Sequence, residues 1–296
     1  MTVQGVHKLL FCGALLCTTL VLPVPAGSFM SFPPGKNVHR QIINAALKRF
    51  FVSVEAIRTI SRGADSQDNP FGSKWSRSEN HSCDNKISQS FAYVDERTNK
   101  AVELAERADS DQWACGNALY AFGEGLHSLQ DFYSHSNYVE WLLMEKEKIA
   151  PIDRTGVNPV PAPIKTCYYF YQSKLKQEAF LSHADNIQAL RAKEKNEAMP
   201  FHSEEEWQAR QATNELSAAL DYALGPGNLL HMELNKDSES QLEGKVQCGK
   251  DGKTLFAIAR DLAIDDTARQ WQTLEERILS RYGDRGSLII KALKGQ

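Results

Sequence analysis

The fold of this chain is decided by residues 123–137, which read Gly123-Glu124-Gly125-Leu126-His127-Ser128-Leu129-Gln130-Asp131-Phe132-Tyr133-Ser134-His135-Ser136-Asn137. His127, Asp131 and His135 are spaced four residues apart. On an α-helix this spacing places the three side chains on one face, within an arc of roughly 80°. Apolar residues between them can seat such a helix in a core. The segment therefore predicts a buried helix that carries a polar stripe.

Imidazole and carboxylate groups are the usual protein ligands of zinc and related divalent metals. The stripe His127-x3-Asp131-x3-His135 can present three such groups to a metal. The alternative is a buried helix with two hydrogen-bonded histidines and a capping aspartate. We favour the metal interpretation, because three ligand-type residues recur at one-turn spacing among apolar neighbours.

The first residues are expected to be an export signal and not part of the fold. His7 and Lys8 precede an apolar run over residues 9–22, and small residues follow it. This pattern is typical of a cleaved secretory signal, and the run is short for a membrane span. Cleavage after Ala26 gives a signal over residues 1–26. Cleavage after Ser28 is the alternative, and it leaves Phe29 as the first residue. We therefore expect a secreted protein without a transmembrane segment.

The cysteine content also fits an exported protein. The expected mature chain keeps four cysteines, which are Cys83, Cys115, Cys167 and Cys248. In an exported protein they predict two disulfides with three open connectivities, and they lack the Cys-x2-Cys spacing of a structural zinc site. Asn80-His81-Ser82 is a sequon for N-glycosylation. If His81 points into a metal site, Asn80 either points outwards or is too hindered to be modified. The formal net charge of −3 gives no general footprint for nucleic acid.

Helical periodicity is frequent along the chain and strand signals are scarce, so we expect one all-α domain over residues 27–296. Helices are expected over residues 38–61, 86–108, 112–148, 169–197, 204–224 and 254–282. Long connections are expected over residues 63–85, 150–166 and 225–253. The first and the third connection carry histidines and acids, so they are expected to fold over the helices and contribute ligands.

Three stretches of the chain resemble the superfamily of zinc-dependent phospholipases C and P1-type nucleases. They are Asn37-Val38-His39-Arg40-Gln41-Ile42-Ile43, then Ala64-Asp65 followed by His81, then residues 123–131. The continuation Leu129-Gln130-Asp131-Phe132-Tyr133-Ser134-His135-Ser136-Asn137, with Leu234-Asn235-Lys236-Asp237-Ser238, is similar to the Het-C branch. That branch includes fungal heterokaryon-incompatibility proteins and the N-terminal region of von Willebrand factor A domain-containing protein 7. The resemblance covers residues 37–145 well and 228–270 weakly.

The resemblance implies an all-helical fold with one to three zinc ions. One zinc would be held by Asp65, His81, His127 and Asp131. A second would be held by His39 and the mature N-terminus at Phe29, and it would share Asp131 as a bridge. His135 would begin a third site, which the superfamily completes with His-x3-Glu. Here only His202 and Glu206 have that spacing, in a charged segment, so we expect His231 and Asp237 instead.

The resemblance also implies a reaction, the hydrolysis of a phosphodiester by metal-activated water, in the manner of a phospholipase C. Asp131 would be the bridging carboxylate, and Asp65 the general base. The expected substrate is a phospholipid head group, reached by contact with a membrane surface. A P1-type nuclease is one alternative. Another is a non-enzymatic, metal-stabilised recognition or incompatibility factor of the Het-C type. A complete third metal site would favour turnover over a structural role.

Overall fold

The computed structural model describes residues 37–69, 73–74, 77–145, 148–154, 160–161, 164–168, 229–230, 234–239, 243–248 and 252–296. This part of the chain is all-α, as the sequence predicts. Its helices are α1 (Val38–Leu47), α2 (Val54–Asp65), α3 (Ile87–Leu104), α4 (Gln112–His135), α5 (Tyr138–Met144), α10 (Leu255–Tyr282) and α11 (Asp284–Lys294). Three 3-10 turns accompany them, η1 (Lys48–Phe50), η2 (Ser78–His81) and η3 (Ala105–Arg107).

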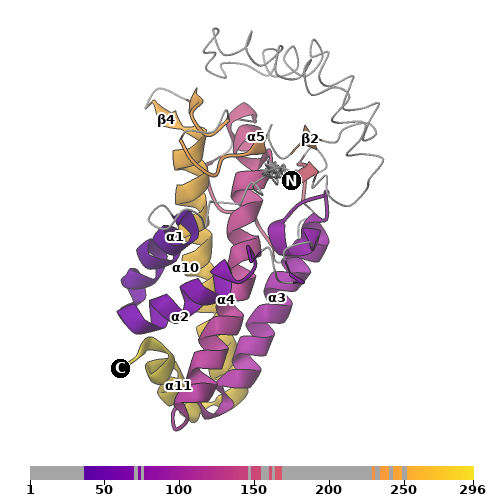
Figure 1. Ribbon diagram of the computed structural model, residues 1–296. Helices are drawn as coiled ribbons and strands as arrows, with labels where there is room; N and C mark the ends of the chain where they lie inside the picture. The colour runs from indigo at the N-terminus through magenta and orange to yellow at the C-terminus, as the bar shows by residue number, and fades with distance from the viewer. Residues whose placement is uncertain are drawn as a thin grey trace, which may run out of the picture.

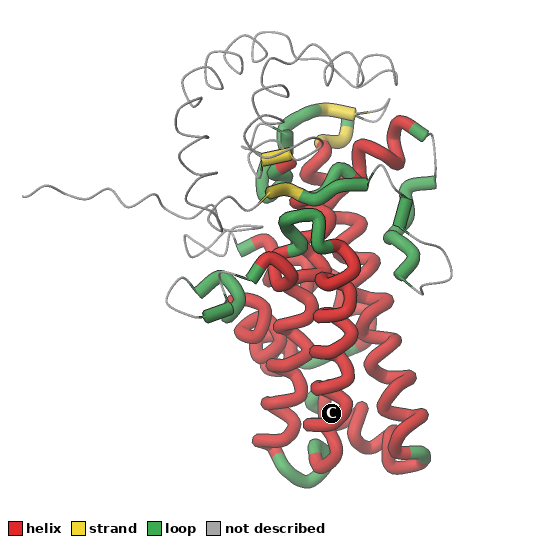
Figure 2. Tube along the Cα trace, turned by 90° about the vertical axis from the view of Figure 1, so that its right-hand side faces the viewer, coloured by secondary structure: helices red, strands yellow, loops and turns green. Residues whose placement is uncertain are grey.

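The described strands are short and form two small ladders. β1 (Cys167–Tyr168) pairs in parallel with β2 (Leu229–Leu230), and β3 (Gln247–Cys248) pairs antiparallel with β4 (Lys253–Thr254). Figure 2 shows these strands and most loops gathered at one end of a bundle of helices, away from the C-terminus.

Helix α4 is the centre of the bundle. Helices α2, α3 and α10 all pack against it, α1 packs on α10 and α2, and α11 folds back on α10 (Figure 1). The α4 residues from Ala121 to His135 are all buried, although seven of them are polar or charged. Because a buried polar group costs free energy unless it has a partner, this end of α4 requires partners from other elements.

Local sequence explains where the helices begin. The side chains of Asn37, Ser53, Asp111 and Thr254 accept hydrogen bonds from main-chain N–H groups in the first turns of α1, α2, α4 and α10. These are favoured N-cap residues, because a helix leaves its first N–H groups without intrahelical partners.

Two of the expected helices are broken in the structure. The helix expected over residues 38–61 is interrupted at Phe51, whose φ is 58°, and Ser53 then caps α2. The helix expected over residues 112–148 ends at His135, because Ser136 is extended and bridges to Thr166. Helix α2 continues past Gly63, where we expected a connection, and α11 was not expected. The helices expected over residues 169–197 and 204–224 lie outside the described residues, as does the signal over residues 1–26.

Helices α2 and α4 cross at two glycines. A Cβ atom added to Gly63 would lie 2.1 Å from the carbonyl oxygen of Tyr120, and one added to Gly123 would lie 2.0 Å from that of Ile60. Either contact is impossible for a real side chain, so these glycines set the distance between the two backbones. The close crossing brings the C-terminal end of α2 and its acidic residues near the polar stripe of α4.

Candidate metal centre

The structure buries the polar stripe of α4 together with side chains from three other segments. His127, Asp131 and His135 are 0% exposed, and so is His39 of α1. His81, at the end of η2, is 1% exposed. The ring centroids of His39 and His127 are 4.3 Å apart, and those of His81 and His127 are 4.9 Å apart. Four residues expected to be ligands, His39, His81, His127 and Asp131, therefore meet at one place.

The two oxygens of Asp131 face different histidines. Oδ1 lies 3.4 Å from Nε2 of His39. Oδ2 lies 3.0 Å from Nε2 of His127 and 3.3 Å from Nδ1 of His81. Among the described residues no hydrogen bond reaches Oδ1, although this atom is buried.

His39 is oriented by a chain of hydrogen bonds to α10. Its Nδ1 lies 2.8 Å from Oε1 of Gln130, which can only accept, so Nδ1 carries the proton. Nε2 of Gln130 in turn donates to Oγ1 of Thr267, at 3.0 Å. With the proton on Nδ1, the neutral imidazole directs the lone pair of Nε2 toward Asp131. A hydrogen-bond acceptor behind the second ring nitrogen is usual for a metal-ligating histidine.

His81 is positioned by the turn that follows it. Ser82 has a φ of 46°, and its hydroxyl donates to the carbonyl of Ser128 on α4 at 2.7 Å. The hydroxyl of Ser128 donates back to the carbonyl of Glu79 at 2.7 Å. These reciprocal bonds fasten η2 to α4, so that His81 faces Asp131.

The carboxylate beside this pair of histidines is Asp68, and not the expected Asp65. Oδ1 of Asp68 lies 3.5 Å from Nε2 of His127 and 3.9 Å from Nδ1 of His81. Asp65, the last residue of α2, accepts hydrogen bonds from Nε of Arg40 at 2.8 Å and from Nδ2 of Asn37 at 2.7 Å. The spacing Asp65-x2-Asp68 offers both candidates, and only the point at which α2 ends decides between them.

Charge and burial shift the pKa values of these groups in opposite directions. Burial alone would raise the pKa of Asp131, but His127 and the other nearby histidines hold it well below its usual value. Burial alone would lower the pKa of His127, but Asp131 and Asp68 outweigh it and raise that pKa to about 9. Burial and the neighbouring His127 lower the pKa of His39. Without a cation, a proton on His127 balances the buried carboxylates.

The donor atoms fit a metal ion. One group consists of His39, His127 and Asp131, and a second of Asp68, His81 and His127, with the ligand atoms of each group within 4.8 Å of one another. Two nitrogen or oxygen ligands on one tetrahedral zinc-sized ion stand about 3.4 Å apart. The separations of 3.0–3.5 Å between Asp131, His39, His127 and Asp68 are close to this value. These clusters can therefore hold a metal ion. We call them together the Asp131 centre.

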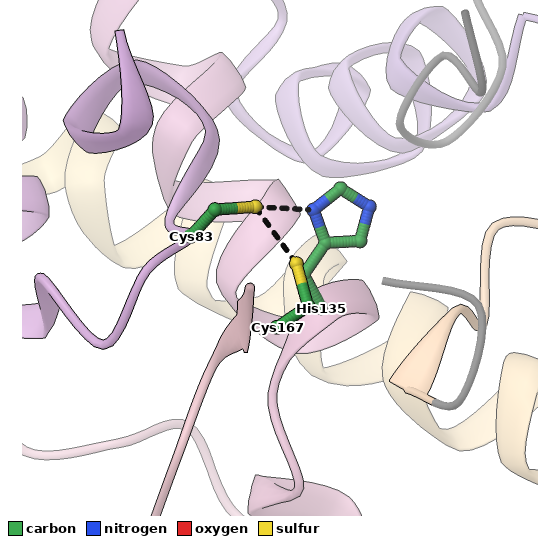
Figure 3. A group of neighbouring side chains, drawn as sticks. All are labelled: Cys83, His135 and Cys167. Carbon is green, nitrogen blue, oxygen red and sulfur yellow. Dashed lines mark hydrogen bonds between the residues drawn. The ribbon is translucent and has the colours of Figure 1, made fainter. Parts of the chain in front are cut away.

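His135 lies one turn beyond the Asp131 centre and faces other partners. Its Nε2 lies 3.2 Å from Oδ1 of Asp237, which was expected beside it. Its Nδ1 lies 3.6 Å from Sγ of Cys83, which is itself 2.8 Å from Sγ of Cys167 (Figure 3). All four side chains are 0% exposed. The sequence did not identify these two cysteines as ligands, because they are 84 residues apart and belong to no paired motif.

The remaining expectations have different outcomes. His231 and Phe29 lie outside the described residues. Asn80 is 1% exposed, and its Nδ2 donates to Gln67 and to the carbonyl of Lys74, so the folded structure leaves no room for a glycan there. The four cysteines described by the structure are free thiols. Cys115 and Cys248 pack in different apolar clusters, so the structure does not bring them together as a second pair.

No protein-family model, no curated protein and no solved structure matches the chain. Among the helices of the described residues, none combines the length and the apolar character needed to cross a membrane.

Proposed function

We propose that the protein is a zinc-dependent phosphodiester hydrolase of the phospholipase C type. The observation that carries this proposal is the geometry of Asp131, whose two oxygens face separate histidine groups. A carboxylate in this arrangement can bridge two cations. The resemblance of residues 37–145 to the zinc-dependent phospholipase C and P1 nuclease superfamily, and to its Het-C branch, supports the same assignment. Export from the cell, expected from residues 1–26, is part of the proposal.

Each residue of the Asp131 centre has a role in this proposal. His39 and Oδ1 of Asp131 would hold one zinc, while Oδ2 of Asp131, His81, His127 and Asp68 would hold the other. Zinc held by these residues would lower the pKa of a bound water toward 7 and neutralise the charge of a phosphodiester. Asp68 has a carboxylate that is 9% exposed, so it takes the place proposed for Asp65 as acceptor of the water proton. Gln130 orients His39 and keeps its Nε2 available.

The preferred substrate is the head-group phosphodiester of a phospholipid. The net charge of −3 gives the chain no general attraction for polyanions, which weighs against a P1-type nuclease.

A second candidate function follows from burial. His39, His127 and Asp131 are 0% exposed, which is the situation of a metal site that stabilises a fold. A non-enzymatic recognition factor of the Het-C type would need only such a stabilising metal site. The experiment must therefore measure hydrolysis of the substrate and zinc-dependent stability as separate quantities.

The test compares Asp131→Asn with Asp265→Asn, which makes the same chemical change at an exposed residue of α10. Both variants and the wild type are supplied with zinc and assayed on phosphatidylcholine and on a chromogenic phosphodiester. We expect hydrolysis by the wild type and by Asp265→Asn, and a loss of more than about 100-fold in Asp131→Asn, since even a residue behind a ligand is typically worth 10–100-fold. Equal rates in all three proteins would refute the catalytic role. No turnover in any of them, with zinc-dependent stability lost only in Asp131→Asn, would favour the recognition factor.

A further inference from the structure

Three fully buried side chains beside the Asp131 centre form a cluster with a different chemistry. Cys83 follows η2, His135 ends α4 and Cys167 begins β1, and Figure 3 shows their side chains pointing toward one another. The ligand atoms Sγ of Cys83, Sγ of Cys167 and Nδ1 of His135 lie within 4.8 Å of one another. Thiolate and imidazole donors together select thiophilic cations, of which zinc is the most common in proteins.

The sulfur pair alone does not decide between a metal and a disulfide. Its Sγ–Sγ separation is 2.8 Å. A disulfide has about 2.05 Å, and two thiolates on one zinc stand about 3.7 Å apart. The third group decides, because Nδ1 of His135 lies 3.6 Å from Sγ of Cys83. A sulfur and a nitrogen ligand of one tetrahedral zinc stand about 3.6 Å apart. A disulfide would not need an imidazole aimed at it.

The other nitrogen of His135 is held as in a metal-ligating histidine. Nε2 lies 3.2 Å from Oδ1 of Asp237, and this oxygen also accepts a hydrogen bond from the hydroxyl of Ser134. A carboxylate that binds the far nitrogen of a histidine fixes the tautomer of the ring and raises the basicity of the nitrogen that binds the metal. With the proton on Nε2, the lone pair of Nδ1 would be directed toward Sγ of Cys83.

Asp237 is itself anchored by its neighbours in the chain. Its N–H donates to Oδ1 of Asn235 at 2.8 Å. Lys236 is fully buried and donates through Nζ to Glu140 at 2.9 Å and to the carbonyl of Ser136 at 2.7 Å. These bonds fix the stretch Asn235-Lys236-Asp237, so the carboxylate of Asp237 is held beside His135.

The main-chain carbonyl of His81 lies at the same place and accepts a hydrogen bond from Cys83. The main-chain oxygen of His81 is 3.3 Å from Nδ1 of His135 and 3.1 Å from Sγ of Cys83. His81 thus offers its ring to the Asp131 centre and its carbonyl to the cysteine cluster.

We propose that Cys83, Cys167 and Nδ1 of His135 form a second metal site, which binds a zinc-class cation and has a structural role. It would join η2, α4 and β1, and so hold the turn that carries His81. The site does not rest on the hydrolase proposal, since it needs no substrate and no turnover.

The test uses Co²⁺ as a probe of the full-length protein, prepared under reducing conditions and freed of metal. Thiolate ligation of Co²⁺ gives a sulfur-to-cobalt charge-transfer band in the near ultraviolet. Among the described residues the Asp131 centre offers only nitrogen and oxygen, so the band reports on the cysteine cluster alone. We expect the band in the wild type and in Asp131→Asn, and its displacement by Zn²⁺. We also expect it in the control variants Cys115→Ser and Cys248→Ser, and its loss in Cys83→Ser and Cys167→Ser.

Asp237→Asn gives a second measurement that does not alter a ligand. It should keep the band but weaken Co²⁺ affinity about 10–100-fold, as expected for a carboxylate behind a ligating histidine. Absence of the band in the folded, reduced wild type would overturn the proposal. Isolation of the untreated protein with Cys83 and Cys167 joined in one disulfide-linked peptide, and with no metal at His135, would overturn it in favour of a disulfide.

Discussion

Nε2 of His127 lies 3.0 Å from Oδ2 of Asp131, one helical turn further along α4, and both side chains are completely buried. This contact joins the histidine whose pKa is raised to about 9 with the carboxylate whose pKa is strongly lowered. The pair is therefore ionised in the metal-free protein, and a cation that binds there must replace a proton.

The first prediction concerns the choice between Asp68 and Asp65. Asp68→Asn should weaken zinc binding at the Asp131 centre at least about 10-fold, because it removes the charge beside His127 and His81. Asp65→Asn should change zinc affinity much less, but it should lower the free energy of unfolding by about 1 kcal/mol through its bonds to Arg40 and Asn37. Zinc titration and urea unfolding of both variants provide the measurement. The opposite order of zinc affinities would return the ligand role to Asp65.

The second prediction concerns Gln130, which holds the ring of His39. Gln130→Leu has a similar volume but no acceptor for Nδ1 of His39, so the ring loses its orientation. We expect zinc affinity to fall about 10–100-fold with helix content preserved. Gln130→Glu keeps the acceptor and should lose less. Equal affinities in the two variants would show that Gln130 does not position His39.

The third prediction concerns the pH dependence of stability in the metal-free protein. The pKa of His127 is raised to about 9 and that of His135 to about 10, from 6.5. Each of these histidines binds its proton more tightly in the folded than in the unfolded protein. The stability that this contributes is fully present below pH 6.5 and is lost as pH rises toward the folded pKa. Between pH 6.5 and 8.5 each histidine should cost about 2 kcal/mol of unfolding free energy. The pKa of His39 is lowered, so this residue reduces stability only when the pH falls below about 6.5.

Urea unfolding in the presence of a chelator at pH 6.5 and 8.5 measures this loss. His127→Gln should remove about half of it. Zinc should reverse the trend, because its ligands must be deprotonated and its affinity rises with pH. A flat profile in the chelated wild type would contradict the ionised pair.

The fourth prediction concerns the crossing of α2 and α4. Gly123→Ala should lower the free energy of unfolding by at least about 1–3 kcal/mol, because the added Cβ would meet the carbonyl of Ile60 at 2.0 Å. It should also weaken zinc binding by moving Asp68 away from His127. Gly116→Ala on the same helix is the matched control, since its added Cβ meets nothing within 4 Å. Removing a helical glycine there should stabilise the protein by about 0.5–1 kcal/mol. Similar effects of both changes would mean that the crossing is not tight.

The sequence by itself determined what depends on local periodicity. The four-residue spacing of His127, Asp131 and His135 puts them on one face of a helix whatever surrounds it, and α4 has this face. The start of the last expected helix at Thr254, whose side chain caps α10, is equally local. The meeting of His39, His81, His127 and Asp131 was expected only through the resemblance to a family, because spacing within one helix says nothing about α1 or η2.

Only the tertiary structure decided the choices that depend on contacts between distant segments. The end of α2 brings Asp68 to His127 and leaves Asp65 to Arg40. The extended Ser136 ends α4 because Thr166, 30 residues later, bridges to it. Cys83 and Cys167 meet His135 because η2 and β1 both pack at that end of α4. Such contacts join residues far apart in the chain, and no local pattern records which of several similar side chains will make them.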